Sequence, residues 1–196
     1  MKQKTFLFFG SSGSGKGTQA RLLQEYLNKN FKREVLYIET GAELRKLAKE
    51  NTKSGHLTKN ILENGKLMPS FVPIWVWSKF LLKNFSGEEY IITDGLSRRL
   101  VEAQILDSAL DFYNLKNTYI VFLNVTRDRA IEMMKKRGRA DDTEEYMNNR
   151  LDWFEENAMP AIMYFRNSTK RKFLDIDGNQ SIEKVQQDIL EGAELL

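Results

Sequence analysis

A glycine-rich loop near the amino terminus is the first stretch of the sequence that could do chemistry. The segment GSSGSGKGT, residues 10–18, follows the apolar run 5–9 and precedes a stretch with helical spacing. Gly10, Gly15 and Lys16 fit the pattern G-x-x-x-x-G-K, in which backbone N–H groups turn inward around phosphate. The amino end of a helix adds partial positive charge there, and Lys16 can reach the terminal phosphates. The sequence therefore predicts a nucleotide polyphosphate site; the alternative is a glycine-rich turn that binds nothing.

Asp94 is the second candidate for chemistry. It ends the apolar run 90–93, which reads as a buried strand. Burying a carboxylate at the end of such a strand costs free energy unless a cation neutralises its charge. Mg²⁺ held by the phosphates of a bound nucleotide, and by Asp94 directly or through water, is the partner we expect.

Alternating short apolar runs and longer helical stretches must position these residues. The runs are rich in β-branched and aromatic residues, and several are apolar on both faces, which is typical of a parallel sheet covered on both sides. The segment 41–85 differs, since it holds about three helical pieces and no strand, and Pro160 predicts a break or kink near residue 158. The expected strands are 5–9, 35–38, 90–93, 118–125 and 173–176. The expected helices are 16–29, 41–50, 70–83, 99–112, 127–136, 143–156 and 181–190.

Composition limits the class of protein. The chain has 196 residues, 41% of them hydrophobic, which suits one domain with its own core. The formal net charge is only +3, so the overall charge does not call for a nucleic-acid partner, and the basic stretch 127–139 has no interleaved aromatic residues. Cysteine is absent, which excludes disulfides and thiolate zinc sites. We find no apolar run long enough for a membrane span or a signal peptide and expect a cytoplasmic monomer.

Six segments in fixed order resemble the adenylate kinases, members of the nucleoside monophosphate kinase family. In the phosphate loop the lysine is followed by a glycine, and the hydroxyl residue comes one position later, in the sequence GKGTQ. The same arrangement is found in these kinases. The other segments are ETGAELR, NGKLMP, ITDGLSRRLVEAQ, KKRGRADDTEEYMNNRL and DIDGNQSIEKV. Together they extend over nearly the whole chain.

The resemblance implies a P-loop α/β fold with a parallel five-stranded sheet, a small helical insertion that binds the monophosphate, and a very short lid. It places the core in residues 1–40, 86–136 and 143–196, the insertion in about 41–85 and the lid in about 137–142. The implied reaction is reversible, Mg²⁺-dependent transfer of a phosphoryl group from ATP to AMP, giving two ADP. An enzyme catalyses such transfer mainly by positioning the two nucleotides and stabilising the charge of the transition state, and covalent catalysis is not required.

The resemblance also implies the site residues. Arginines that clamp and bridge two polyanions are the expected catalytic groups, because each can direct two donors at phosphate oxygens. The catalytic residues would be Lys16, Arg98, Arg137, Arg139 and Arg150. ATP would be bound by Gly13, Ser14, Gly15, Lys16, Gly17, Thr18, Arg137 and Gln180. AMP would be bound by Thr40, Gly41, Arg45, Met68, Gly95, Arg98, Glu102, Gln104, Arg139 and Arg150.

Two positions leave selectivity open. The family's base-reading glutamine corresponds to Glu102, with Gln104 two residues later, and a carboxylate can only accept hydrogen bonds from the base. An arginine that packs on the ATP adenine in the family corresponds to Met133, so the choice between ATP and GTP is open too. The alternatives are a kinase for GMP, CMP or UMP, and a nucleotide-binding module without an acceptor site.

Overall fold

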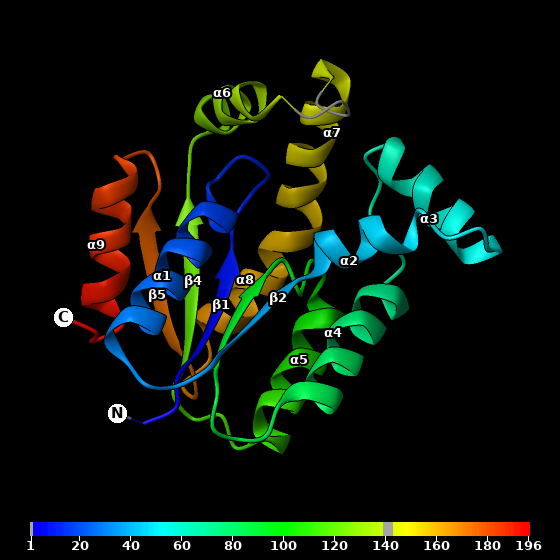
Figure 1. Ribbon diagram of the computed structural model, residues 1–196. Helices are drawn as coiled ribbons and strands as arrows, with labels where there is room; N and C mark the ends of the chain where they lie inside the picture. Colours follow the sequence, from blue (N-terminus) through cyan, green and yellow to red (C-terminus); the bar gives the residue numbers. More distant parts are fainter. Residues whose placement is uncertain (1, 139–142) are drawn as a thin grey trace.

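The computed structural model describes residues 2–138 and 143–196 and contains a five-stranded sheet between two layers of helices (Figure 1). All strands are parallel, in the order β2-β3-β1-β4-β5, which confirms the predicted fold class. The strands are β1 (Thr5–Phe9), β2 (Val35–Glu39), β3 (Tyr90–Asp94), β4 (Thr118–Asn124) and β5 (Lys172–Asp177).

The helices follow the predicted stretches closely. The segment 41–85 contains the three expected helical pieces, α2, α3 and α4. The break expected near residue 158 is a π-helical turn, Phe154–Ala158, that joins two α-helices just before Pro160, and the second of these helices was not given a range from the sequence. The helices are α1 (Lys16–Asn30), α2 (Thr40–Leu47), α3 (Lys53–Glu63), α4 (Phe71–Asn84), α5 (Leu100–Phe112), α6 (Arg127–Arg137), α7 (Glu144–Trp153), α8 (Met159–Arg166) and α9 (Ile182–Gly192).

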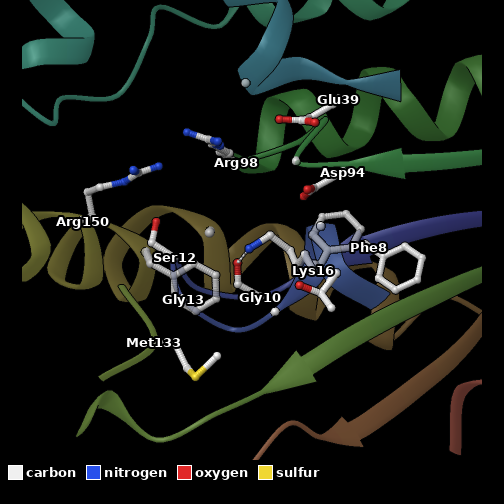
Figure 2. A pocket seen from close by; sticks show the side chains of 18 of the residues that line it. Phe8, Gly10, Ser12, Gly13, Lys16, Glu39, Asp94, Arg98, Met133 and Arg150 are labelled. Carbon is white, nitrogen blue, oxygen red and sulfur yellow. Dashed lines mark hydrogen bonds between the residues drawn. The ribbon is translucent and has the colours of Figure 1, made fainter. Parts of the chain in front are cut away.

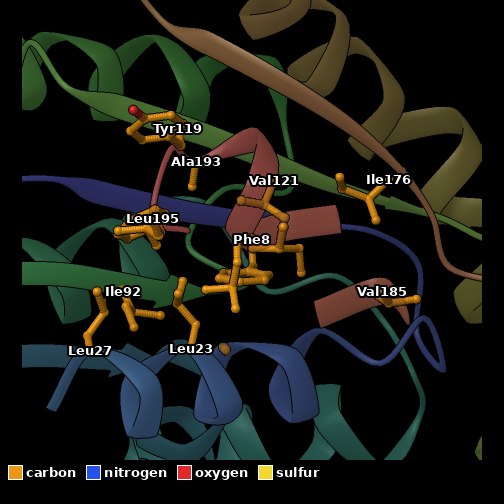
Figure 3. Packing of buried hydrophobic residues seen from close by; sticks show 14 of the residues in the cluster. Phe8, Leu23, Leu27, Ile92, Tyr119, Val121, Ile176, Val185, Ala193 and Leu195 are labelled. Atoms are coloured by element: carbon orange, nitrogen blue, oxygen red, sulfur yellow. The ribbon is translucent and has the colours of Figure 1, made fainter. Parts of the chain in front are cut away.

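Both faces of the sheet are buried, as alternation along β1 shows. Phe6 and Phe8 point to one face, where they pack with α1 and α9 (Figure 3). Leu7 and Phe9 point to the other face and pack with α4, α5 and α8. Continuous burial of this kind is the reason that the strand reads as an unbroken apolar run.

The strand order places the glycine-rich loop at the centre of one sheet edge. β1 lies between β3 and β4, so the chain leaves β1 where the connections diverge to opposite sides of the sheet. In open parallel sheets the crevice at this point, outside the carboxyl ends of the strands, is where ligands bind. Asp94, the last residue of β3, stands at the same edge.

The helices α2 and α3 project beyond the sheet edge on the side of β2 (Figure 1). Leu44, Met68 and Val76 form a small separate apolar cluster that ties α2 to α4. Further along α4, Trp77 and Leu81 join the main core beside α5. Among the described helices we find none long and apolar enough to cross a membrane.

Candidate active site

The glycine-rich loop connects β1 directly to α1 and needs its glycines. Gly13 has φ 84°, and a Cβ there would lie 2.2 Å from the carbonyl oxygen of Ala130 in α6. Gly15 has φ 88° and occupies the position just before α1, where the chain changes from loop to helix. Positive φ is inexpensive only for glycine. These glycines let the loop curl over the amino end of α1, with its unpaired N–H groups facing a potential anion.

Lys16 lies across this loop. Its Nζ donates hydrogen bonds to the carbonyl oxygens of Gly10 and Ser11, both at 2.8 Å. Burial, together with the smaller effect of nearby arginines, lowers the pKa of Lys16 to about 8, and Asp94 opposes this shift. The lowered pKa means that the surroundings of Lys16 do not fully compensate the charge of its ammonium group. A phosphate group in the cleft would do so.

The loop forms one wall of a cleft of about 440 Å³ (Figure 2). The cleft is lined by the ends of β1, β2 and β3 and by parts of α1, α2, α6 and α7. Its charged lining is predominantly basic, as expected for a site that binds polyanions. The charged residues are Lys16, Glu39, Arg45, Asp94, Arg98, Lys136, Arg137 and Arg150.

Arg98 and Arg150 are held in place by aromatic side chains of α7. The guanidinium of Arg98 lies 5.5 Å from the ring centroid of Trp153. Arg150 lies 5.2 Å from the Tyr146 ring and donates to its hydroxyl at 3.1 Å. Burial lowers the pKa of Arg98 and the nearby Arg45 adds to this, whereas Asp94 and Glu102 oppose it. The two arginines are thus oriented before any ligand binds, at an electrostatic cost that a phosphate would relieve.

Asp94 faces the basic groups across the cleft. Its carboxylate lies 3.3 Å from where a Cβ of Gly17 would stand, so this part of the loop approaches it closely. Thr18, whose side chain carries a hydroxyl, lines the same cleft. These oxygen donors are of the kind that Mg²⁺ prefers. The described residues contain no group of three or more Asp, Glu, His or Cys side chains that would hold a metal without a nucleotide.

Most of the predicted site residues that the structure describes line this one cleft. They come from five separate helices and strands and the loops next to them. Arg139 lies outside the described residues. The predicted residues in the lining are Gly13, Gly15, Lys16, Gly17, Thr18, Gly41, Arg45, Asp94, Gly95, Arg98, Arg137 and Arg150.

Other predicted residues do not line the cleft. Ser14 and Met68 are buried, and Thr40 is buried at the start of α2 with its hydroxyl unpaired among the described residues. Gln104 is exposed on α5. Gln180 donates to the carbonyl oxygen of Asp177 and to the carboxylate of Asp188.

Glu102 is almost fully buried, with 1% of its surface exposed, and both carboxylate oxygens accept hydrogen bonds from protein groups. Oε1 accepts from the Ser70 hydroxyl at 2.7 Å, and Oε2 accepts from the Arg98 backbone N–H at 2.6 Å. Arg99 completes the group, since its Nη1 lies 3.8 Å from Oε1 and donates to the carbonyl oxygen of Met68. Glu102 therefore joins the loop after β3 to the start of α4.

Sequence reasoning missed several residues of the cleft. Glu39, Lys136, Trp153 and Ala158 line it, although none was named as a site residue; Glu39 and Lys136 stand inside two of the segments that resemble the family, ETGAELR and KKRGRADDTEEYMNNRL. Lys136 belongs to a run of basic residues that reads as a solvated helix face, and it is paired with Glu132 at 2.6 Å. Trp153 ends α7 and Ala158 ends the π-helical turn after it, so only the fold brings these two residues to the cleft.

Comparisons with known proteins agree with this geometry. The model of the family described as "Adenylate kinase" matches residues 8–170. An adenylate kinase of Prochlorococcus marinus (strain AS9601) is 31% identical over 187 residues, covering 95% of this chain and 97% of that protein. "Adenylate kinase 1" of Nostoc sp. is 32% identical over 184 residues, covering 93% and 95%. One from Corynebacterium aurimucosum is 31% identical over 186 residues, covering 95% and 97%.

The comparisons and the cleft identify the same class of enzyme. The matched range begins in β1 and includes the phosphate loop and each of the described arginines that line the cleft. The chain therefore belongs to the adenylate kinase family of nucleoside monophosphate kinases, phosphotransferases that exchange a phosphoryl group between ATP and AMP.

Proposed function

We propose that this cleft binds ATP on the phosphate loop and AMP on the opposite side, and transfers the terminal phosphoryl group in line between them. The attacking group is an ionised phosphate oxygen, so no general base is needed. The chain instead has to bring two polyanions together and neutralise the charge that builds up between them. The single observation that supports this most is the convergence of Lys16 with arginines from separate helices and loops on one cleft.

On the ATP side, the loop residues Gly13 to Thr18 would surround the β- and γ-phosphates with backbone N–H groups. Lys16 would exchange its loop carbonyl partners for phosphate oxygens, whose negative charge would stabilise the ammonium form that burial disfavours. Arg137 would contact the same phosphates from the end of α6. We assign the adenine of ATP to the loop near Gln180, beyond the carboxyl end of β5.

On the acceptor side, Arg45 and Arg98 would hold the monophosphate. Arg150, and Arg139 if it enters the same cleft, would bridge the acceptor and the transferring group. The base would lie toward α2 and the start of α4, where Thr40 and Gly41 begin α2 and Met68 packs with Leu44. Gly95 would leave room for the acceptor, and Glu102 or Gln104 remains a candidate for reading the base.

Mg²⁺ is the metal that fits this donor set. Asp94 and Thr18 offer hard oxygen donors beside the amino end of α1, and Mg²⁺ commonly binds one or two such groups, waters and the substrate phosphates. The ion would supply charge neutralisation on the transferring phosphates. Asp94 would hold it directly or through water.

The proposal includes a cytoplasmic monomer without a nucleic-acid partner. Each residue that we assign to the reaction belongs to this one chain, so a single copy would suffice. Sedimentation velocity at micromolar concentration tests the monomer; a mass of twice 22.9 kDa would contradict it.

A two-site ligand tests the proposed arrangement directly. We expect a bisubstrate analogue, two adenosines joined by a chain of phosphates, to bind at least 100-fold more tightly than ATP, because its second half binds at high effective concentration. Equilibrium titration calorimetry measures both affinities. Equal affinities would favour the alternative of a nucleotide-binding module with no acceptor site, and tighter binding of an analogue with a different second base would favour a kinase for another monophosphate.

A further inference from the structure

Glu39 is a carboxylate in a cleft that otherwise suits polyanions. It ends β2, lines the cleft, and stands beside Asp94 in the register of the two neighbouring strands. Figure 2 shows both carboxylates on the same side of the cleft, across from the phosphate loop. A second acid here repels the phosphates that the site must bind, and it requires an explanation that Mg²⁺ binding by Asp94 does not supply.

The partner of Glu39 is the residue assigned to the acceptor phosphate. Oε1 of Glu39 accepts a hydrogen bond from Nη2 of Arg45 at 2.8 Å, and Arg21 lies 3.6 Å from the other oxygen. Although Glu39 occupies the position just before α2, its side chain does not cap that helix. The carboxylate is therefore engaged with Arg45 rather than with the backbone.

Gly41 makes this pairing possible. A Cβ at Gly41 would lie 3.2 Å from Nη1 of Arg45, so the guanidinium folds back directly over this glycine to reach Glu39. The Arg45 side chain is still 48% exposed and that of Glu39 21% exposed. A pair in such surroundings is weak enough to be exchanged for another anion.

We propose that Glu39 competes with the acceptor phosphate for Arg45 and thereby sets the affinity for the monophosphate. In the free protein Glu39 holds the guanidinium at the cleft wall. When the acceptor binds, its phosphate takes over the donors of Arg45. This inference rests on the proposed role of Arg45 as an acceptor clamp, and it makes Glu39 a residue that lowers acceptor affinity without touching the reacting atoms.

The test is the affinity for AMP of Glu39→Gln, measured by titration calorimetry, with the KM for AMP and kcat measured in parallel. We expect the dissociation constant and KM to fall roughly threefold to fivefold, the effect of removing one partly exposed ion pair. The kcat and the KM for ATP should stay within about twofold. Glu43→Gln is the matched control, because Glu43 carries the same charge four residues later, on α2, but pairs with Lys46 at 2.6 Å. Glu39→Ser and a thermal melt guard against misfolding.

A double-mutant cycle separates the possible failures. Arg45→Ala should weaken AMP binding strongly, and Glu39→Gln should bring little further gain in that background. An equal gain with and without Arg45 would mean simple repulsion between Glu39 and the phosphate, and would overturn the proposal. So would a tenfold loss of kcat in Glu39→Gln, or an unchanged affinity. If Arg45→Ala leaves AMP binding intact, the assigned role of Arg45 is wrong instead.

Discussion

At the scale of one residue, Lys16 shows how the cleft suits a phosphate ligand. Its ammonium group is desolvated and lies among arginines, and among the described residues it donates to two loop carbonyls and a serine hydroxyl. These conditions disfavour the charged form, which is why its pKa lies near 8 rather than 10.5. A triphosphate reverses the balance, because its charge stabilises the ammonium.

The shifted pKa predicts proton uptake when ATP binds. At pH 8 about half of the free protein has a neutral Lys16, since the pKa is about 8. Binding raises that pKa, so the complex keeps the proton and roughly 0.5 proton is taken up per ATP. Affinity should therefore weaken as the pH rises above 8. Calorimetry in two buffers of different ionisation enthalpy measures the uptake.

Lys16→Met provides the control for this measurement. The uptake should disappear in this variant and persist in Lys29→Met, which removes an exposed lysine from the other end of the same helix. Proton release on binding, or an uptake that survives Lys16→Met, would contradict the assignment of the low pKa to this lysine.

At the scale of elements, the loop after β3 and the start of α4 act as one unit. Glu102 on α5 accepts hydrogen bonds from the backbone N–H of Arg98 and the hydroxyl of Ser70, so the loop after β3 and the residue before α4 share one buried carboxylate. A substitution that empties this position leaves two partly buried donors without this partner. Glu102 thus holds two segments of the chain together, whereas the resemblance suggested that this position contacts the base of the acceptor.

We predict that Glu102→Ala lowers the free energy of unfolding by about 2 to 4 kcal/mol, through the two lost hydrogen bonds. Glu102→Gln should lose much less, because one amide oxygen can still accept from Arg98 and the amide N–H can donate to Ser70. Gln104→Ala, on the exposed face of α5, should change stability by less than about 0.5 kcal/mol. Urea titration measures all three.

The outcome also separates the two roles open to Glu102. If Glu102→Ala unfolds like the parent protein and changes only the ranking of acceptor bases, the carboxylate reads the base and the contacts with Ser70 and Arg98 contribute little.

The elements were largely predictable because their signals are local. Strand β1 is an uninterrupted apolar run, the phosphate loop is a fixed pattern of glycines and a lysine, and Pro160 cannot donate the hydrogen bond that a regular helix requires. What local patterns could not supply is the exact form of the interruption: a π-helical turn, Phe154–Ala158, that contributes Phe154 and Ala158 to the cleft lining.

At the scale of the whole molecule, the fold brings charged residues from different parts of the sequence together in one cleft. Arg45, Arg98, Arg137 and Arg150 are far apart in the sequence, and the overall net charge of +3 gives no sign of a strongly basic cleft. Their grouping could be inferred only from the resemblance to a family, since spacing along the chain does not determine contacts across a sheet edge. Glu39 was not assigned a role from the sequence either: it only opens the ETGAELR segment, and nothing in that segment shows that its carboxylate reaches the cleft.

The most direct test of this account is the initial rate of diphosphate formation by the purified protein with Mg-ATP and, separately, AMP, GMP, CMP, UMP and dTMP. Chromatography of the products follows each reaction. We predict strong preference for AMP, two ADP formed per ATP consumed, and a loss of about 100-fold or more in kcat for Lys16→Met. Preference for another acceptor would contradict the assignment of AMP, and no transfer to any of the five would contradict the account as a whole.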